Sequence, residues 1–579
     1  MFKKYRKSVA LLVVCMMLIA SISACRAESE PADTPGETDT QQPADTPAEP
    51  DTEDEQEIEQ ELTTLRIFTI ANTGITVPGI QDDMVAQRIK EDTGIIMDIE
   101  NVEGVMIGQR ISAMMAADDL PDIFAYDNDA ELRQSLIRTG LGLDITDLAE
   151  EGLYNWWNNE QLNFVLNFSK EFLSDGTGRL FNIPVNNGMN NSPTNLTVGA
   201  YLRWDLYSEL GYPEVNDIMD VVPVLEAMVE RWPETADGRP TYGAGFWVDW
   251  LMWPVMVFGF IDGYAEGDDY LGSICIQTEE FISLLDDRSP FWKYTRFYNA
   301  IYQAGILHPD SFIMNFVDWD AVVTSGQVYF FINGWMKDNW VGEPHQGFGL
   351  IDTTGDSQKS YPIWGQEVGY SYMISSRSQV PERAIDFFNY LALESSIKML
   401  HNGLEGVVWN YDENGKPNLI LDVWERVSDM TNPARFNYGI KYSNLAPIAG
   451  GMKCSNGFYF NFTFDYEFAA LTMTEVDRAN AAFYGVTIPS EIYTRKPYTF
   501  YGNLVTAGMP AIDDHEHQVA LNNIQNYIND NWINMIIADD WEAARETFTN
   551  DLLAMGFEEV LERFLEVYHE YRDRINALR

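Results

Sequence analysis

Two short segments carry residue types that bind metal ions. The run Asn410-Tyr-Asp-Glu-Asn-Gly415 matches the first half of a calcium loop, but Leu421 stands at the twelfth position, where such a loop needs a bidentate glutamate. We therefore interpret the run as a hairpin turn. The run Asp513-Asp-His-Glu-His517 offers zinc-type ligands, but residues two apart on a helix do not face one another. Capping of a helix by Asp513 or Asp514 explains this run better.

Catalytic patterns are equally scarce. The sequence has six histidines and contains neither the GxSxG pattern of a nucleophilic serine nor the HExxH pattern of a zinc hydrolase. Apart from two cysteines near the N-terminus it has only Cys275 and Cys454, too few for a disulfide framework or a CxxC zinc site. The 89 acidic residues leave one alternative open, in which two carboxylates about 5 to 10 Å apart act as acid and base on a glycosidic bond. Otherwise we expect no catalysis, metal or cofactor.

Tryptophans provide a different chemistry, that of recognition. The segment WVDWLMW places Trp247, Trp250 and Trp253 three residues apart. Aromatic faces pack on the apolar C–H faces of sugar rings, and planar polar side chains pair with the hydroxyl groups. The same spacing also fits the buried face of a helix. Both interpretations stay open for this segment.

The N-terminus has the pattern of an export signal. Basic residues precede an apolar run, Val9 to about Ile22, that is too short to span a bilayer. It ends in Ile22-Ser-Ala-Cys25, which resembles a bacterial lipobox. We therefore predict a signal peptide at 1–24 and lipidation of Cys25, whose acyl chains would anchor the protein at the extracytoplasmic face of the cell membrane. An ordinary signal peptide with a chance cysteine is the alternative.

An acidic spacer follows. Residues 25–63 are rich in Pro, Thr, Asp and Glu and almost free of apolar residues, which predicts a disordered linker. The whole chain has a net charge of −52, and most of it remains when the linker is set aside. Such charge repels phosphate backbones and anionic lipid surfaces. We therefore expect no nucleic-acid partner and interpret the acidity of the body as a solvated surface.

The body begins as alternating strands and helices. The pattern predicts strands at 65–70, 95–100 and 122–126 with helices at 82–93 and 105–117 between them. Such βαβαβ units form parallel sheets, and ligands bind beyond the carboxyl ends of their strands. At 579 residues with 46% hydrophobic residues, the chain exceeds what one core holds, so at least two lobes are expected.

The residues also carry a family resemblance. Ala116-Ala-Asp-Asp-Leu-Pro-Asp-Ile123 resembles the ASGDLPDI segment of extracellular solute-binding proteins that feed carbohydrate ABC importers, although Ala117-Asp118 replaces Ser-Gly. Further matches follow in the order of that family: 142–148, 179–184, 202–211, 302–310, 326–330, 381–391, 403–406 and 526–556. Pro223 interrupts a helix that the family has. The chain looks most like the large lipoprotein subgroup that includes alginate- and rhamnogalacturonan-oligosaccharide-binding proteins.

This resemblance implies an α/β fold of the type II periplasmic-binding class. Two α/β lobes are joined by a hinge and enclose an interlobe ligand cleft. The expected division is an N-lobe at 64–185 and 359–410 and a C-lobe at 186–358 and 411–579, the last range ending in helices. Pro184 marks the first crossing because proline favours an extended chain.

The resemblance also suggests site residues. Tyr126 and Asp127 follow the third strand, where the family contacts sugar, although Asp127 is also suited to cap a helix. Asn186 and Asn187 follow the crossing. Arg203 and Asp205 form either an ion pair or, for a uronate ligand, an arginine site for its carboxylate. The candidate aromatic contacts are Trp253, Trp335, Trp364 and Trp409.

The function implied is capture and delivery. We expect a monomeric, membrane-anchored lipoprotein that binds an oligosaccharide and passes it to ABC transporter permease subunits. The alternatives are a surface hydrolase with an Asp/Glu pair and a lipoprotein that binds a peptide or protein.

Overall fold

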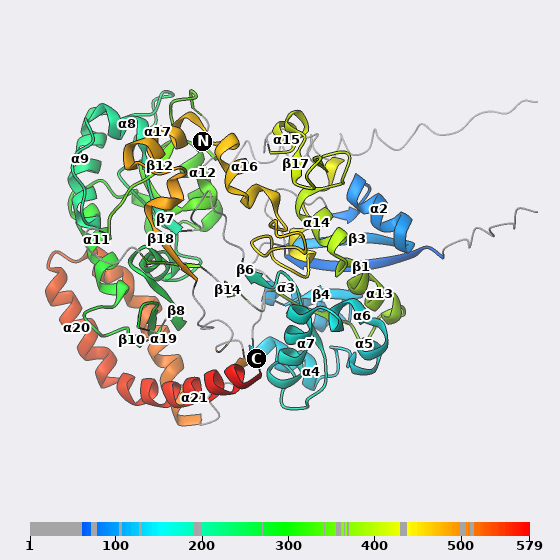
Figure 1. Cartoon of the computed structure of the whole chain (residues 1–579). Coiled ribbons are helices and arrows are strands. Elements are labelled where there is room, and N and C mark those ends of the chain that lie inside the picture. Colours follow the sequence, from blue (N-terminus) through cyan, green and yellow to red (C-terminus); the bar gives the residue numbers. More distant parts are fainter. Residues whose placement is uncertain are drawn as a thin grey trace, which may run out of the picture. The chain divides into compact units, whose positions relative to one another are not determined.

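The structure is a computed structural model that describes most of the chain from residue 61 to 578. The ranges left out within it are 71–77, 103–106, 127–129, 190–195, 197, 269, 279, 338, 341, 355–359, 364, 367–369, 429–436, 498–504, 506–507 and 510–514. The chain divides into the units Met1–Glu59 and Gln60–Arg579, and the second unit carries the elements drawn in Figure 1. The predicted signal peptide, Cys25 and nearly all of the linker precede the described residues.

A sheet of six strands organises the first core. Its order is β2-β3-β1-β4-β15-β5, with β1 parallel to β3 and β4 and with β15 antiparallel to β4 and β5. The bounds are β1 Thr63–Ile70, β2 Gly79–Ile80, β3 Ile95–Val102, β4 Ile123–Ala125, β5 Asn182–Pro184 and β15 Ser371–Ile374. The predicted βαβαβ unit is confirmed, since β1, β3 and β4 are parallel, helix α2 (Met84–Thr93) lies between β1 and β3 in the chain, and helix α3 (Ile107–Ala117) lies between β3 and β4.

Local chemistry fixes the ends of α2. The Asp83 carboxylate accepts hydrogen bonds from the N–H groups of Val85 and Ala86, both at 3.0 Å. Gly94 ends the helix at φ 71°, a left-handed conformation that glycine adopts without strain. A strand follows at once, so the sequence confines the helix to the ten residues between cap and glycine.

Further helices cover this first core. They are α4 Ala130–Arg138, α5 Thr146–Gly152, α6 Tyr154–Trp157, α7 Glu160–Phe172, α13 Pro381–Leu391 and α14 Glu394–Asn402. Residues from Tyr442 to Phe460 also pack into it. The expected division assigns all of 411–579 to the C-lobe, whereas this segment packs with the first core. It stays with the first core because Lys441 forms a buried ion pair with Asp83, and because Tyr442 and Ile448 are buried there.

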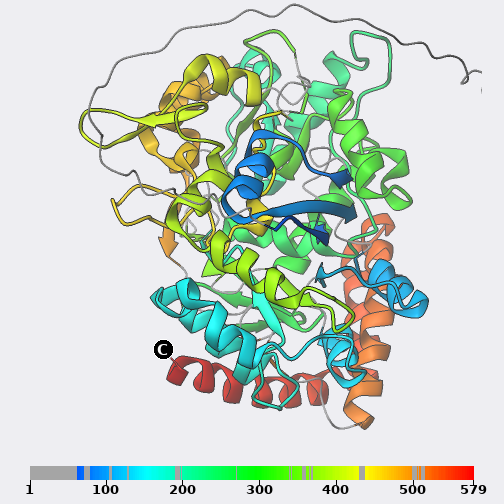
Figure 2. The same ribbon diagram turned by 90° about the vertical axis from the view of Figure 1, so that its right-hand side faces the viewer.

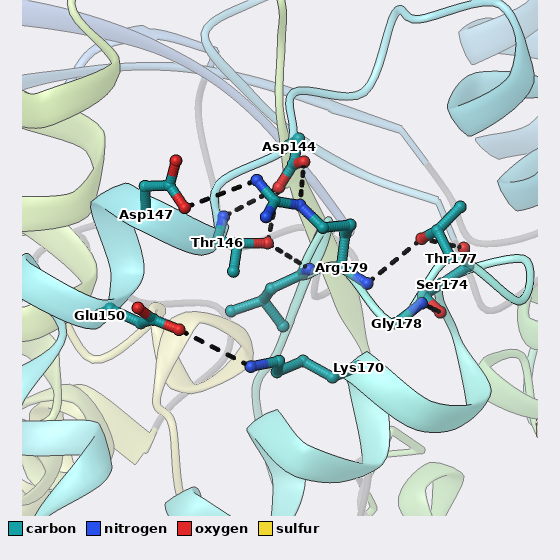
Figure 3. Close-up of polar contacts among 10 residues, drawn as sticks. Asp144, Thr146, Asp147, Glu150, Lys170, Ser174, Thr177, Gly178 and Arg179 are labelled. Atoms are coloured by element: carbon teal, nitrogen blue, oxygen red, sulfur yellow. Dashed lines mark hydrogen bonds and ion pairs between the residues drawn. The ribbon is translucent and has the colours of Figure 1, made fainter.

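A polar cluster ties two of the family-like segments together (Figure 3). Arg179 Nε lies 2.5 Å from Asp144 Oδ2, and Arg179 Nη2 lies 3.5 Å from an Asp147 oxygen. Asp144 accepts from both the N–H and the hydroxyl of Thr146, and the Thr146 hydroxyl in turn accepts from Leu180 N–H at 2.8 Å. These contacts align the start of α5 with the strand that leads to the crossing. Because Arg179 is exposed, these ion pairs contribute little to stability. Their role is to hold the start of α5 in place against the strand.

The second core surrounds a smaller antiparallel sheet of order β11-β7-β12. Its strands are β7 Val198–Arg203, β11 Phe330–Asn333 and β12 Phe348–Leu350, and a second three-stranded sheet contains β8 Tyr264–Asp268, β9 Gly272–Cys275 and β10 Glu280–Ser283. The helices around them are α8 Trp204–Glu209, α9 Val221–Arg231, α10 Trp253–Met256, α11 Pro290–Gln303, α12 Phe316–Thr324 and α17 Glu475–Tyr484. Pro223 falls in the first turn of α9, where a missing N–H costs nothing, so that helix continues.

Three long helices end the chain: α19 His515–Ile537, α20 Trp541–Ala554 and α21 Phe557–Leu578. Both views place the end of α21 beside α7 (Figures 1 and 2), and Tyr571 there contacts Phe172 with ring centroids 5.9 Å apart. The remaining elements are the pairs β6 Gly188–Met189 with β14 Gly365–Gln366, β13 Ser360–Ile363 with β18 Thr494–Pro497, and β16 Trp409–Tyr411 with β17 Pro417–Leu419, together with α15 Leu421–Ser428 and α16 Tyr466–Thr472. In the part of the chain that is described, no helix has the length and apolar character needed to cross a membrane.

The crossing between the two cores lies directly after β5. Asn186 N–H donates to Ala446 O at 2.6 Å and Asn187 N–H to Pro447 O at 3.0 Å, so two chain segments cross side by side. The Asn187 side chain also donates to Pro184 O and Pro447 O, at 2.7 and 2.8 Å. Two α/β lobes joined by such crossings are what the sequence predicts for the fold.

Candidate functional site

Four aromatic side chains from distant segments form what we call the aromatic shelf: Trp250, Trp253, Phe316 and Trp335. Trp250 stacks on Phe316 with centroids 4.6 Å apart and an interplanar angle of 18°. Trp335 lies 5.8 Å from Trp253 and 6.4 Å from Phe316, centroid to centroid. Trp335 is 42% exposed, and such exposure is unusual for a large aromatic ring in a cluster of this kind. The other three rings are partly buried against the second core, so Trp335 is the member of the shelf that is exposed to solvent.

The shelf rests on buried rings. Trp247 and Trp319 are each 1% exposed and stack on one another with centroids 6.1 Å apart, and Trp247 also contacts both Trp250 and Trp253. Trp247 therefore has the buried position that one of the two interpretations of WVDWLMW predicts, whereas Trp250 and Trp253 are only partly buried. The segment is not a continuous helix, because Leu251 adopts φ 55° and α10 begins only at Trp253.

A buried ion pair holds the turn that carries Trp335. Lys337 Nζ lies 2.6 Å from Asp477 Oδ1, and the side chains are 7% and 10% exposed. Asp477 also belongs to the capping box of α17 with Thr474. Burial acts to raise the pKa of Asp477, but the attraction of Lys337 and the hydrogen bonds from Lys337 and Thr474 together outweigh it, so the pKa lies below the usual value. The ion pair thus connects the Trp335 turn to the start of α17.

Close packing fixes the same turn from its other side. A Cβ atom on Gly334 would lie 1.7 Å from Leu196 O, so only glycine lets the chain approach there. The position of Trp335 is therefore set by backbone contact on one side and by the ion pair on the other.

One carboxylate lies at the edge of the shelf. Asp249 precedes Trp250 in sequence, and its Oδ1 accepts a hydrogen bond from Phe316 N–H at 2.9 Å. It therefore sits beside the stacked pair of Trp250 and Phe316. Burial raises the pKa of the Asp249 carboxyl above its usual value, and the nearby Asp318 carboxylate adds to the effect.

Arg203 and Asp205 form a buried pair with each other. The guanidinium donates to both carboxylate oxygens, at 2.9 and 2.7 Å, and its carbon lies 4.0 Å from the centroid of the Trp340 ring. The side chains are 8% and 7% exposed. Of the two expected roles, the structure contains the intramolecular ion pair, in which the guanidinium is paired with Asp205.

Comparison with known proteins decides the fold. No protein-family model and no curated protein matches the sequence. Among solved structures, the S. pneumoniae ABC-transporter substrate-binding protein FusA in complex with kestose is 14% identical, and the match covers 89% of this chain and 100% of that one with a TM-score of 0.57. The chain has the fold of a solute-binding protein.

Other solved structures with this solute-binding fold also match. A solute-binding protein from Bifidobacterium longum infantis, associated with an ABC transporter and described as HMO-binding, is 12% identical over 88% of this chain and 99% of that one, with a TM-score of 0.56. The alginate-binding protein AlgQ2, without calcium ion, is 15% identical over 88% and 99%, with a TM-score of 0.54. The fold predicted from the sequence is thereby confirmed.

Other predicted contacts lie inside the solute-binding fold. The Tyr126 ring is fully buried, and its hydroxyl donates to Asn182 Oδ1 at 2.6 Å. Asn186 and Asn187 are buried in the crossing. The side chains of Tyr126 and Asn187 form internal hydrogen bonds, and Asn186 bonds through its backbone N–H. Asp127 and Trp364 fall in the ranges that the structure leaves out.

Trp409 belongs to a small separate core. It is buried with Leu419 and Phe462, and its indole N–H donates to Gly403 O at 2.9 Å. It lies in the wall of a pocket of ≈ 340 Å³ on the first core. Charged groups in that wall pair with each other, since Lys398 Nζ lies 2.6 Å from Glu394 Oε1. Trp409 therefore packs in a core of its own and is not part of the shelf.

The two metal-like runs have different outcomes. β16 and β17 pair on either side of Asp412, which accepts from the N–H groups of Asn414 and Lys416 at 2.8 Å each, so the predicted hairpin turn is confirmed. Asp513 and Asp514 lie outside the described ranges. Among the residues that are described, no three His, Cys, Asp or Glu side chains are grouped so that they could hold a metal ion.

Proposed function

We propose that the protein is an extracytoplasmic lipoprotein that binds an oligosaccharide on the aromatic shelf and delivers it to the permease of an ABC importer. The observation that carries this is the exposed Trp335 ring among Trp250, Trp253 and Phe316 on a solute-binding fold. Flat aromatic faces bind the C–H faces of sugars without chemistry. The names of the similar structures, which mention kestose, HMO and alginate, support a sugar as the ligand.

The wider arrangement is part of the same proposal. Lipidation of Cys25 anchors a monomer to the membrane, and the acidic linker lets the body move above the surface. The lobes comprise 64–185, 359–410 and the segment around 442–460 on one side and the remaining body on the other. Asp127 and Trp364 stay in the proposal as further ligand contacts. Labelled palmitate should enter the wild-type chain in cells but not the Cys25→Ala variant.

Calorimetric titration of the full chain with a panel of oligosaccharides tests the binding. We expect one or more sugars to bind and to be recovered intact, and Trp335→Ala to weaken the binding of the same sugar by about 1 to 3 kcal/mol, as stacking on an aromatic ring usually contributes. Tyr154→Ala is the matched control, because Tyr154 is an exposed ring of α6 in the first core.

The other outcomes separate the alternatives. Cleaved sugar would establish a hydrolase, and binding of peptides without any sugar would establish a different receptor. Equal loss of affinity in Trp335→Ala and Tyr154→Ala would remove the shelf from the proposal.

A further inference from the structure

Two carboxylates, Asp249 and Asp318, lie next to the aromatic shelf. Asp249 sits at its edge, held to Phe316 by a backbone hydrogen bond of 2.9 Å. Asp318 follows in the first turn of α12, two residues after Phe316. Neither carboxylate forms an ion pair with a lysine or arginine among the described residues. Two carboxylates without cations therefore border the stacked pair of Trp250 and Phe316.

Two cations near the shelf, Lys337 and Arg203, form buried ion pairs within the protein. Lys337 is two residues from Trp335, but its ammonium is buried against Asp477 at 2.6 Å. Arg203 ends β7, the strand paired with β11, and is buried in a bidentate contact with Asp205. To bind an anionic ligand, either cation would have to leave a buried carboxylate without its partner, which typically costs several kcal/mol.

These observations bear on the class of ligand. A carboxylate accepts hydrogen bonds from hydroxyl groups and has no proton to donate when ionised, so it suits the diols of a neutral sugar. It repels the carboxylate of a uronate or the sulfate of a sulfated sugar. Asp249 is placed to do both, since its backbone contact holds it beside the rings that would carry the sugar.

We infer that the shelf binds an uncharged oligosaccharide and that Asp249 is a specificity-determining residue that selects against acidic sugars. This inference rests on the proposed function. It separates the possible ligands into two classes that differ in charge and not in size.

The test compares neutral and acidic sugars of equal length. Maltotetraose, cellotetraose, xylotetraose and mannotetraose form the neutral panel, and tetragalacturonate and tetramannuronate form the acidic panel. Calorimetry with the full chain should detect binding in the neutral panel and weak or no binding in the acidic panel. Raising the salt concentration should narrow the difference, because salt screens repulsion between exposed charges.

Variants assign the selectivity to one residue. Asp249→Asn keeps the oxygen that accepts from Phe316 N–H and removes the charge. We expect the ratio of acidic to neutral affinity to rise about 2- to 5-fold, the size of effect usual for a partly exposed charge. Asp530→Asn makes the same charge change at an exposed site on α19 and should leave the ratio unchanged.

The outcomes that contradict the inference are distinct. Tighter binding of an acidic sugar to the wild-type chain would overturn it and leave the proposed function intact. An unchanged ratio in Asp249→Asn, with normal folding by circular dichroism, would remove Asp249 from the role. Binding of no sugar from either panel would overturn the proposed function, and the inference with it.

Discussion

Lys337 and Asp477 are 140 positions apart in sequence and touch through a single hydrogen bond. Each is buried, so each depends on the other to remain charged inside the protein. Lys337 follows the turn that carries Trp335, and Asp477 accepts a hydrogen bond from the N–H of Thr474, the N-cap of α17. One pair of residues therefore links the exposed ring of the shelf to the body of the second core.

Loss of the cation should affect stability and binding together. In Lys337→Met the Asp477 carboxylate would stay buried without its partner, and we expect the free energy of unfolding to fall by about 3 to 5 kcal/mol. Ligand affinity should fall as well, because the Trp335 turn loses its anchor. Chemical denaturation and calorimetry measure the two effects. Lys337→Arg should recover part of the affinity, and full affinity in Lys337→Met would show that the pair does not position Trp335.

The same pair predicts a dependence on pH. The pKa of Asp477 is lower in the folded protein than its usual value, so the ion pair stabilises the fold above the unfolded pKa of about 3.9. That stability is lost as the pH falls through the folded pKa. The difference in unfolding free energy between wild type and Asp477→Asn should therefore be largest near pH 7 and shrink below about pH 4. A difference that stays constant from pH 7 to pH 3 would contradict this.

At the scale of elements, α2 depends on one side chain for two purposes. Asp83 caps the helix through Val85 and Ala86 and also lies 2.9 Å from Lys441 Nζ in a buried pair. The helix cap is local in sequence, whereas the pair brings in a segment more than 350 residues away. Folding of α2 onto the sheet is thereby coupled to the segment after Gly439.

Removal of this carboxylate should cost more than removal of a simple cap. We expect Asp83→Ala to lower the free energy of unfolding by about 3 kcal/mol or more, since Lys441 loses its buried partner. Asp540→Ala is the control, because Asp540 caps α20 through Ala543 N–H at 3.1 Å at an exposed site. It should cost about 1 kcal/mol. Urea denaturation of both variants measures the difference, and equal losses would contradict the second role of Asp83.

The sequence predicts the helices and strands of the first core better than it predicts the aromatic shelf. The alternation of apolar residues suffices for β1, β3 and β4 and for the helices between them, because it acts over a few positions, but it does not place β15 beside β4. The shelf depends on Phe316 and on Lys337 with Asp477, which only the folded chain brings together. Trp409 matches the family pattern but is buried on Gly403, and no local signal distinguishes it from Trp335.

At the scale of the whole body, α21 connects the helices at the end of the chain with α7. Tyr571 contacts Phe172, and the Arg574 guanidinium lies over both rings, 4.6 and 5.0 Å from their centroids. α7 itself contributes Leu162 and Leu166 to the first core and Phe168 to the second. The end of the chain therefore packs against a helix that belongs to both cores.

A double-mutant cycle measures this contact. Phe172→Ala and Tyr571→Ala should each destabilise the protein, and the double variant should cost less than the sum by about 0.5 to 1.5 kcal/mol, as for other aromatic pairs. The chain also offers a pair for comparison: Tyr154 in α6 with Tyr571 should show additive losses. Additive losses for Phe172 and Tyr571 would mean that the two rings do not interact in solution.

Several hydrogen bonds join the two chain segments at the crossing, so we expect the segments to move together. The backbone carbonyl of Asn187 accepts a hydrogen bond from Ala449 N–H. The backbone N–H and the side chain of Asn187 both donate to Pro447 O. Neighbouring positions of the two segments are therefore bonded to each other. Sliding one segment past the other would break several of these bonds at once, whereas twisting the ribbon about its long axis would keep them. Any rotation of one sheet relative to the other would therefore twist this pair of segments, and the hydrogen bonds of Asn186 and Asn187 would resist the twist.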